Sequence, residues 1–337
     1  MTITLGYIGF SLNPGFPETD ILTRFFKDGD RVSNNLSEIN VLIIGDFLTQ
    51  QENDLVQSYK GLRIMYVAEP LLNLPFCSIS GQIFRQKKYN AVIGCISNRD
   101  GTYNWVKYPL YRYAVKFTKD SFAETNQYVA SIDATNIKTK SFCTLINRHD
   151  WGNTRTPIYK KLAKIGKIAC PGKLFNNCSN EELNQIGNVE YIKKFIFNIC
   201  CENFGNDHPG YVTEKLMNAC LGGAIPIYFG ELDDIDKKIF NVDRILVLNN
   251  DNTDKIANKV KLLYENQDAL ERFYRQPVFC VGAYEEMLAM DVNAMGFFDT
   301  LREHLRGSRG LSAESATLAR PEGGRDNPPR HPHHKGS

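Results

Sequence analysis

The residues with evident chemical potential lie in the stretch 195–230, where polar side chains interrupt two apolar runs. Asn203 follows the first apolar run, and Tyr211, Glu214 and Lys215 come after a loop of Gly, Asn, Asp and Pro. The amino end of a helix exposes free backbone N–H groups and the positive end of a dipole, which suit an anion such as a diphosphate. Lys215 would add a positive charge, and Glu214 could accept hydrogen bonds from ribose hydroxyls. An ordinary capped helix whose charges face water is the alternative interpretation.

A strand, a loop, a helix and a second strand must position these residues. The run 195–201 is short, β-prone and nearly uncharged, which predicts a buried strand. Thr213 is placed to cap the following helix, and residues 216–220 carry one apolar stripe. The glycine pair 222–223 predicts the end of the helix, and 224–230 predicts the next strand.

The motif within this unit also resembles that of a known family. Glu202-Asn203, then Tyr211-Val-Thr-Glu-Lys215, then the letters AIPIYFG resemble the signature of the α1,3/4-fucosyltransferases, inverting glycosyltransferases that use GDP-fucose. The pattern has many informative positions and is far more specific than a lone Gly-rich loop. The resemblance implies that Asn203 and Tyr211 contact the sugar or diphosphate, Lys215 the diphosphate and Glu214 the ribose.

Glu69 directly follows a strongly apolar run, and Pro70 stops that run from continuing as a strand. Ligands of open α/β sheets bind beyond the carboxyl ends of strands, so Glu69 would face such a crevice. A Glu at a strand end is also common as a solvated turn residue. The letters YVAEP resemble the fucosyltransferase segment in which a Glu acts as general base, which implies this role for Glu69. Glu52, Glu38 and Glu18 are the alternative carboxylates.

Arg155 stands at the amino end of a predicted helix. The run from Arg155 to Leu162, RTPIYKKL, resembles the family segment Arg-x-x-Phe-Tyr-x-x-Leu, in which the Arg binds the donor diphosphate. A planar guanidinium suits this role because it can pair two phosphate oxygens. A surface Arg is the alternative, although its charge is unfavourable at a helix start without an anion. Arg148 is a second candidate.

Strands and helices alternate along the chain, which indicates doubly wound α/β domains. We expect an N-terminal domain over 1–138, a C-terminal domain over 139–306 and a disordered tail over 307–337, where large apolar residues are nearly absent. The resemblance covers roughly residues 40–300 and is strongest at 142–245. It implies the GT-B arrangement, two Rossmann-like domains facing a central cleft, with the acceptor on the first domain and the GDP-sugar on the second.

Composition narrows the class of protein. The 337 residues include 40 basic and 38 acidic side chains, so no broad field for nucleic acid is expected. No apolar run is long enough to span a membrane, and no signal peptide is evident. We therefore expect a soluble cytoplasmic protein, with peripheral membrane contact left open.

Several smaller patterns complete the sequence interpretation. The nine cysteines form no CxxC pair, which favours buried free thiols over a zinc site. The aspartates at 233, 234 and 236 predict a solvated loop rather than a metal site. The aromatic-rich run 103–113 predicts a helix packed on the first sheet, with sugar stacking as the alternative. No cofactor is expected to be required, and a divalent metal would at most stimulate.

Together these observations predict an inverting glycosyltransferase. It would move L-fucose from GDP-fucose to a hydroxyl of an oligosaccharide or glycoconjugate acceptor, on an N-acetylglucosamine or glucose unit, through an α1,3 or α1,4 linkage. Glu69 would accept the proton of the attacking hydroxyl. The alternatives are a GT-B transferase that uses another nucleotide sugar and a non-catalytic nucleotide- or glycan-binding protein.

Overall fold

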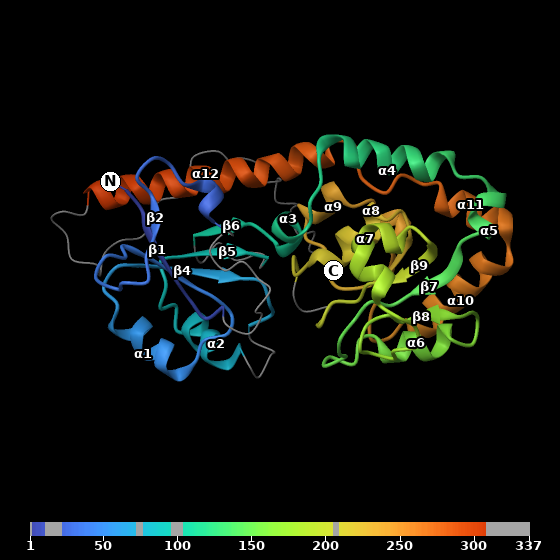
Figure 1. Cartoon of the computed structure of the whole chain (residues 1–337), viewed down its shortest axis with the longest axis horizontal. Helices are drawn as coiled ribbons and strands as arrows, with labels where there is room; N and C mark the ends of the chain where they lie inside the picture. Colours follow the sequence, from blue (N-terminus) through green and yellow to red (C-terminus); the bar gives the residue numbers. More distant parts are fainter. Residues whose placement is uncertain (1, 11–21, 72–76, 96–103, 205–208, 308–337) are drawn as a thin grey trace, which may run out of the picture.

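Two parallel sheets with flanking helices lie side by side in the computed structural model (Figure 1). The structure describes residues 2–10, 22–71, 77–95, 104–204 and 209–307. Glu18 and residues 308–337 of the expected tail lie outside these ranges. None of the helices in the described ranges is long and apolar enough to cross a membrane.

The first sheet has six strands in the order β2-β1-β3-β4-β5-β6, and each pair is parallel. Its strands are β1 (Thr4–Ile8), β2 (Arg31–Val32), β3 (Val41–Ile44), β4 (Leu62–Val67), β5 (Ala91–Gly94) and β6 (Trp105–Lys107). Every residue of β3 and β5 is buried, as expected for a sheet covered on both faces. Figure 1 shows the helices α1 (Gln50–Ser58) and α2 (Ser78–Arg85) on one side of this sheet.

The second sheet has five parallel strands in the order β11-β10-β9-β7-β8. Its strands are β7 (Ser141–Thr144), β8 (Ile168–Ala169), β9 (Phe195–Ile199), β10 (Ile225–Phe229) and β11 (Leu246–Leu248). The helices of this part are α6 (Thr156–Leu162), α7 (Glu181–Ile192), α8 (Glu214–Leu221), α9 (Asp236–Ile239), α10 (Thr253–Glu265) and α11 (Gln267–Tyr274). The predicted strand–loop–helix–strand unit is therefore β9, α8 and β10.

Three helices pack in a way that departs from the predicted domain division at residue 138. The sheets do separate near it, because β6 ends at Lys107 and β7 begins at Ser141. The helices α4 (Lys119–Ser131) and α5 (Ala134–Lys138), however, pack on the second unit, on α8 and α11 respectively. The long helix α12 (Ala283–Gly307) contacts both units, α9 of the second unit and β6 and the short helix η1 (Thr23–Phe25) of the first.

Buried polar contacts fix α12 on the first unit. The Arg302 guanidinium donates to the carbonyl of Phe25 at 2.8 Å and, through Nε, to Asp30 at 3.1 Å. Figure 1 shows α12 in red along the face of the first sheet opposite α1 and α2. The helix α12 therefore packs against residues near the start of the described chain.

The aromatic-rich run 103–113 differs from the predicted single helix. Its described part forms the edge strand β6 and then the short helix α3 (Leu110–Ala114), with Pro109 as the N-cap of the helix. Tyr108 and Tyr111 are fully buried. Proline disfavours helical backbone in the residue before it, which explains why a strand and a helix replace one continuous helix.

Candidate active site

A cavity of about 980 Å³ lies between the two units, at the carboxyl ends of strands of both sheets. Glu69, just after β4, and Leu110 of α3 line it from the first unit. The second unit contributes residues that follow β7, β8 and β9 or begin α8, including Asn147, Arg148, His149, Lys173, Asn203, Thr213, Glu214 and Lys215. Crevices beyond the carboxyl ends of parallel strands are where such folds bind ligands. This cavity is therefore the candidate active site.

Glu69 is held by both units. Its Oε2 accepts hydrogen bonds from the Tyr211 hydroxyl at 2.7 Å and from Asn203 Nδ2 at 3.4 Å. Its backbone N–H donates to the buried carboxylate of Asp46 at 3.0 Å. Burial raises the pKa of Glu69, and the charge of Lys215 and the bond from Tyr211 oppose that rise. A carboxylate with a raised pKa is a stronger base, which suits proton abstraction.

The alternative carboxylates serve other contacts. Glu52 closes the capping box of α1 with Thr49 and accepts the backbone N–H of Gly9 at 3.0 Å. Glu38 is exposed and pairs with Arg31 at 3.0 Å. Neither is among the residues that line the cavity, whereas Glu69 is.

Arg155 lies beneath the cavity wall and has no exposed surface. Its guanidinium donates to the carbonyls of His149 at 3.1 Å and Cys201 at 2.8 Å, and to Asn203 Oδ1 at 3.0 Å. Asn203 in turn donates to Glu69, so Arg155 reaches the cavity through Asn203. Direct pairing of Arg155 with a diphosphate stays a prediction.

The loop that precedes Arg155 also contacts the segment that follows β9. Thr154 Oγ1 donates to the carbonyl of Glu202 at 2.8 Å. Gly152 lies against the backbone of Asn203. A Cβ added to Gly152 would be 2.0 Å from the carbonyl oxygen of Asn203. A glycine is required there because any side chain would displace this backbone.

The helix α8 begins as predicted, with Thr213 as its N-cap. The fully buried Glu202 accepts the backbone N–H of Thr213 at 2.8 Å and its hydroxyl at 2.7 Å. Lys215 Nζ donates to Thr213 Oγ1 at 2.9 Å and lies 3.4 Å from Glu202 and 3.5 Å from Glu214. Burial lowers the pKa of Lys215, but the carboxylates of Glu214, Glu202 and Glu69 outweigh this and raise it. The ammonium is therefore held positive at the helix start.

The structure brings the six predicted site residues into one connected group. Hydrogen bonds run from Arg155 to Asn203 and from Asn203 and Tyr211 to Glu69. Lys215 joins through electrostatic contact with Glu69, and Glu214 joins as its ion-pair partner. The charge of Lys215 lowers the pKa of Glu69, and Lys215 Nζ lies 3.5 Å from Glu214.

Sequence reasoning gave no separate role to Glu202 or His149. Glu202 could have been found by the logic applied to Glu69, since it also follows an apolar strand. His149 lines the cavity and stacks on Trp151 with ring centroids 3.6 Å apart. Burial, followed by the charges of Arg155 and Lys215, lowers the pKa of His149, so its imidazole is held neutral.

The rest of the second unit's wall is polar and carries further positive charge. Arg148 and Lys173 line the cavity and are exposed. Asparagines stand at four-residue intervals along α7 and its N-cap, at Asn180, Asn184 and Asn188. Amide groups both donate and accept hydrogen bonds, so this wall suits a neutral polyhydroxylated or heterocyclic group beside an anion.

The prediction of a solvated loop at 233–236 was wrong for two of its three aspartates. Asp233 and Asp236 are buried, and both carboxylates contact Lys107 Nζ, at 2.8 Å and 3.0 Å. Only Asp234 extends into solvent. The like charges tolerate burial because an ammonium from the first unit lies between them.

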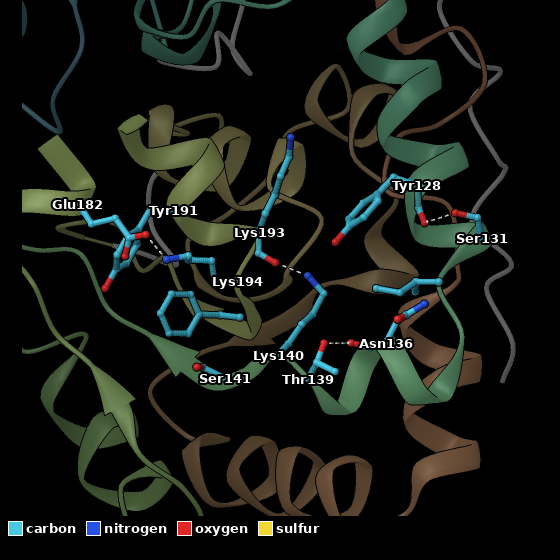
Figure 2. A pocket seen from close by; sticks show the side chains of 12 residues that line it. Tyr128, Ser131, Asn136, Thr139, Lys140, Ser141, Glu182, Tyr191, Lys193 and Lys194 are labelled. Carbon is cyan, nitrogen blue, oxygen red and sulfur yellow. Dashed lines mark hydrogen bonds and ion pairs between the residues drawn. The ribbon is translucent and has the colours of Figure 1, made fainter. Parts of the chain in front are cut away.

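A second cavity of about 720 Å³ lies at the amino ends of two strands of the second sheet, beside the starts of β7 and β9 (Figure 2). Its lysines have partners within the protein: Lys140 donates to the carbonyl of Lys193, and Lys194 pairs with Glu182. It contains none of the predicted site residues. The interdomain cavity thus remains the candidate active site.

Within the described ranges, no group of three or more His, Cys, Asp or Glu side chains is placed to hold a metal ion. All nine cysteines are free, and seven of them are buried.

Parts of the chain are similar to known fucosyltransferases. Residues 135–280 match the family model "Glycosyltransferase family 10 (fucosyltransferase) C-term". The α-(1,3)-fucosyltransferase FucT of Helicobacter pylori is 25% identical over 200 residues, 57% of this chain and 40% of the relative. The 4-galactosyl-N-acetylglucosaminide 3-α-L-fucosyltransferase 9 of Cricetulus griseus is 31% identical over 107 residues, 32% of this chain and 27% of the relative. The matched parts thus span less than half of either relative.

Solved structures establish the fold. A crystal structure of an α1,3-fucosyltransferase aligns with a TM-score of 0.62 and 16% identity, over 87% of this chain and 90% of that one. A structure described as the enzyme with GDP-fucose aligns with a TM-score of 0.57 and 18% identity, with the same coverage. The predicted GT-B fold is confirmed, and residues 135–280 are similar to the C-terminal part of glycosyltransferase family 10, the fucosyltransferase family.

Proposed function

We propose that this protein is an α1,3-fucosyltransferase that moves L-fucose from GDP-fucose to a hydroxyl of an acceptor glycan. One observation carries the proposal: a carboxylate of the first unit, Glu69, and the cationic helix start of the family 10 domain, with Lys215, line one cavity. An inverting transferase needs a base on the acceptor side and positive charge on the leaving-group side. The donor and the linkage are proposed from the names of the relatives given above, which are α1,3-fucosyltransferases.

In the proposed reaction Glu69 accepts the proton of the attacking acceptor hydroxyl. The hydroxyl oxygen forms a bond to the anomeric carbon of fucose while the bond from that carbon to the diphosphate oxygen breaks. The electron pair of the broken bond leaves with GDP. Because the hydroxyl attacks from the face opposite the diphosphate, a β-linked donor yields an α-linked product. The hydrogen bonds from Tyr211 and Asn203 hold the carboxylate of Glu69 in place during this step.

Positive charge beside the diphosphate stabilises the leaving group. Lys215 stands at the amino end of α8, where the helix dipole and its ammonium act on the same anion. Glu214 would accept hydrogen bonds from the ribose, and the exposed Arg148 and Lys173 add charge along the same wall. Arg155 supports this site through Asn203, and it would meet the diphosphate directly only after a local rearrangement.

The acceptor would enter from the first unit, beside Glu69 and Leu110. We expect an N-acetylglucosamine or glucose unit of an oligosaccharide or glycoconjugate, with transfer to O3 and, alternatively, to O4. The chemistry at Glu69 is the same for either hydroxyl, so the linkage depends on how the acceptor ring is oriented.

The decisive experiment is an acceptor screen with GDP-fucose, followed by linkage analysis of the product by NMR. The expected result is α1,3-linked fucose on an N-acetyllactosamine or lactose acceptor. Thermal shift with GDP and UDP tests the donor, and we expect stabilisation by GDP alone. Stabilisation by UDP and transfer only from a UDP-sugar would overturn the proposed donor. Nucleotide binding without transfer or hydrolysis would favour a non-catalytic protein.

A further inference from the structure

A buried ion cluster joins the two units next to the cavity. Lys107 ends β6 of the first unit, and its side chain is 3% exposed. Its ammonium contacts Asp233 Oδ2 at 2.8 Å and Asp236 Oδ2 at 3.0 Å, both of which follow β10 of the second unit. Tyr111 of α3 adds a hydrogen bond to Asp236 Oδ1 at 2.8 Å. A buried charge group of this kind is costly unless every member is paired, so its geometry is tightly fixed.

The same ammonium holds the loop that leads into α8. Lys107 Nζ donates to the carbonyl of Gly210 at 3.2 Å. Gly210 has a φ of +84°, and a Cβ there would lie 2.6 Å from Asp233 Oδ2 and 3.0 Å from Lys107 Nζ. The backbone therefore reaches the cluster only because residue 210 has no side chain.

Tyr211 comes directly after this anchored carbonyl. Its side chain belongs to the apolar cluster formed by β3, β4 and β5 of the first unit, which includes Met65 and Val67. Its hydroxyl donates to Glu69 Oε2 at 2.7 Å. The position of Gly210 therefore fixes where the hydroxyl of Tyr211 meets the base.

We propose that Lys107, Asp233 and Asp236 form an interdomain clamp that positions Tyr211, and through it Glu69, for transfer. The inference rests on the proposed function for its catalytic part. None of the clamp residues is among those that line the cavity, so they are positioning residues. The clamp also joins the unit that carries the base to the unit that carries the cationic helix start.

A double-mutant cycle tests the route through Tyr211. Lys107→Met should lower kcat by about tenfold or more, while the Kd for GDP stays within about threefold, because the nucleotide contacts lie on the second unit. Tyr211→Phe should do the same. The double variant should lose no more than about the larger single loss, since both changes break one connection. Multiplying losses would overturn the proposal.

The pH profile supplies a readout that a merely structural role would not move. The hydrogen bond from Tyr211 lowers the pKa of Glu69, so its loss should shift the acid limb of kcat/KM to higher pH. Lys215, Glu202 and Asp46 also act on this carboxyl and are unchanged in the variants. Lys107→Met should shift the limb in the same direction as Tyr211→Phe. An unmoved limb in folded Lys107→Met would overturn the proposal.

Two further variants allow the proposal to be tested even if Lys107→Met does not fold. Asp233→Asn leaves the Lys107–Asp236 pair charge-balanced and should show the same effects, more weakly. Lys161→Met removes a partly exposed lysine that pairs with Asp254 on the second unit, and it should leave all measured quantities unchanged. Wild-type kcat and pH profile in Asp233→Asn would count against the clamp even if Lys107→Met failed to fold.

Amide hydrogen exchange separates the clamp from the proposed function. The amides of Val212 and Thr213 are bonded to the Gly210 carbonyl and to Glu202. Release of Gly210 in Asp233→Asn or Lys107→Met should speed exchange in this segment, whatever reaction the enzyme catalyses. If the wild type transfers no fucose, the proposed function fails, and faster exchange still supports the clamp. Unchanged exchange in both variants would overturn it.

Discussion

Replacement of Lys215 by Met tests the leaving-group side of the site. The ammonium lies in the first turn of α8, with its side chain 20% exposed, and is the cation held there by Glu202 and Glu214. Methionine keeps an unbranched chain of similar length and removes only the charge. We expect a large loss in turnover, because charge develops on the diphosphate as the bond to fucose breaks.

The size of the loss follows from the position of the charge. Two unit charges about 4 Å apart interact by about 4 kcal/mol at an effective dielectric constant of about 20. Removal of one preorganised donor from an active site typically costs about 3–4 kcal/mol, which is the same range. Since about 1.4 kcal/mol corresponds to a tenfold change in rate, kcat should fall by about 10²–10³.

The assay is steady-state release of GDP from GDP-fucose with a saturating acceptor, alongside GDP affinity by calorimetry. Circular dichroism and the melting temperature must first show that Lys215→Met folds, because Glu202 loses its cation. Lys173→Met is the matched control: this lysine lines the same cavity but is exposed, so its loss should change kcat by less than about tenfold. A folded Lys215→Met enzyme with kcat within about threefold of wild type would refute the assignment.

Four further outcomes follow from the site. Glu69→Gln should keep GDP affinity and lose about 10²–10⁴ in kcat, measured as GDP release; retained transfer would move the base to another carboxylate. In wild type, kcat/KM should fall with decreasing pH around a midpoint above the ordinary 4.5, because the base must be ionised and burial raises its pKa; a midpoint at or below 4.5 would contradict this. Arg155→Lys should lower the melting temperature and kcat, because an ammonium cannot span the three acceptors of the guanidinium; a large loss of GDP affinity at unchanged stability would show direct diphosphate pairing instead. EDTA should leave most of the turnover in place, because Lys215 supplies the charge that a metal would provide; complete loss restored by Mg²⁺ would contradict this.

Local patterns predicted the elements of the fold well. Apolar runs located β4, β9 and β10, and Thr213 was identified as the cap of α8 from its residue type and the helix that follows. These features depend on residues within one or two turns of each other. Sequence spacing therefore contains most of the relevant physics.

Long-range contacts explain what the sequence did not reveal. Three aspartates close together read as a solvated loop, because nothing near them in sequence could neutralise them. Their partner, Lys107, lies 126 residues before Asp233. Arg155 likewise looked like a ligand-facing cation, and its burial depends on carbonyls at positions 149 and 201. The partners of a charged residue can be read from the sequence only when they lie on the same helix, strand or loop as that residue.

The packing of α12 also depends on residues that are far apart in the sequence. It contacts α9 of the second unit as well as β6 of the first, and its Arg302 pairs with Asp30 over a separation of 272 residues. The contact between Tyr211 and Glu69 spans 142 residues in the same way. The contact of Tyr211 with Glu69 joins segments that belong to different units. The arrangement of the active site therefore depends on the interface between the two units. Substitutions at this interface, such as Asp233→Asn, can change turnover although the substituted residue does not contact the substrate.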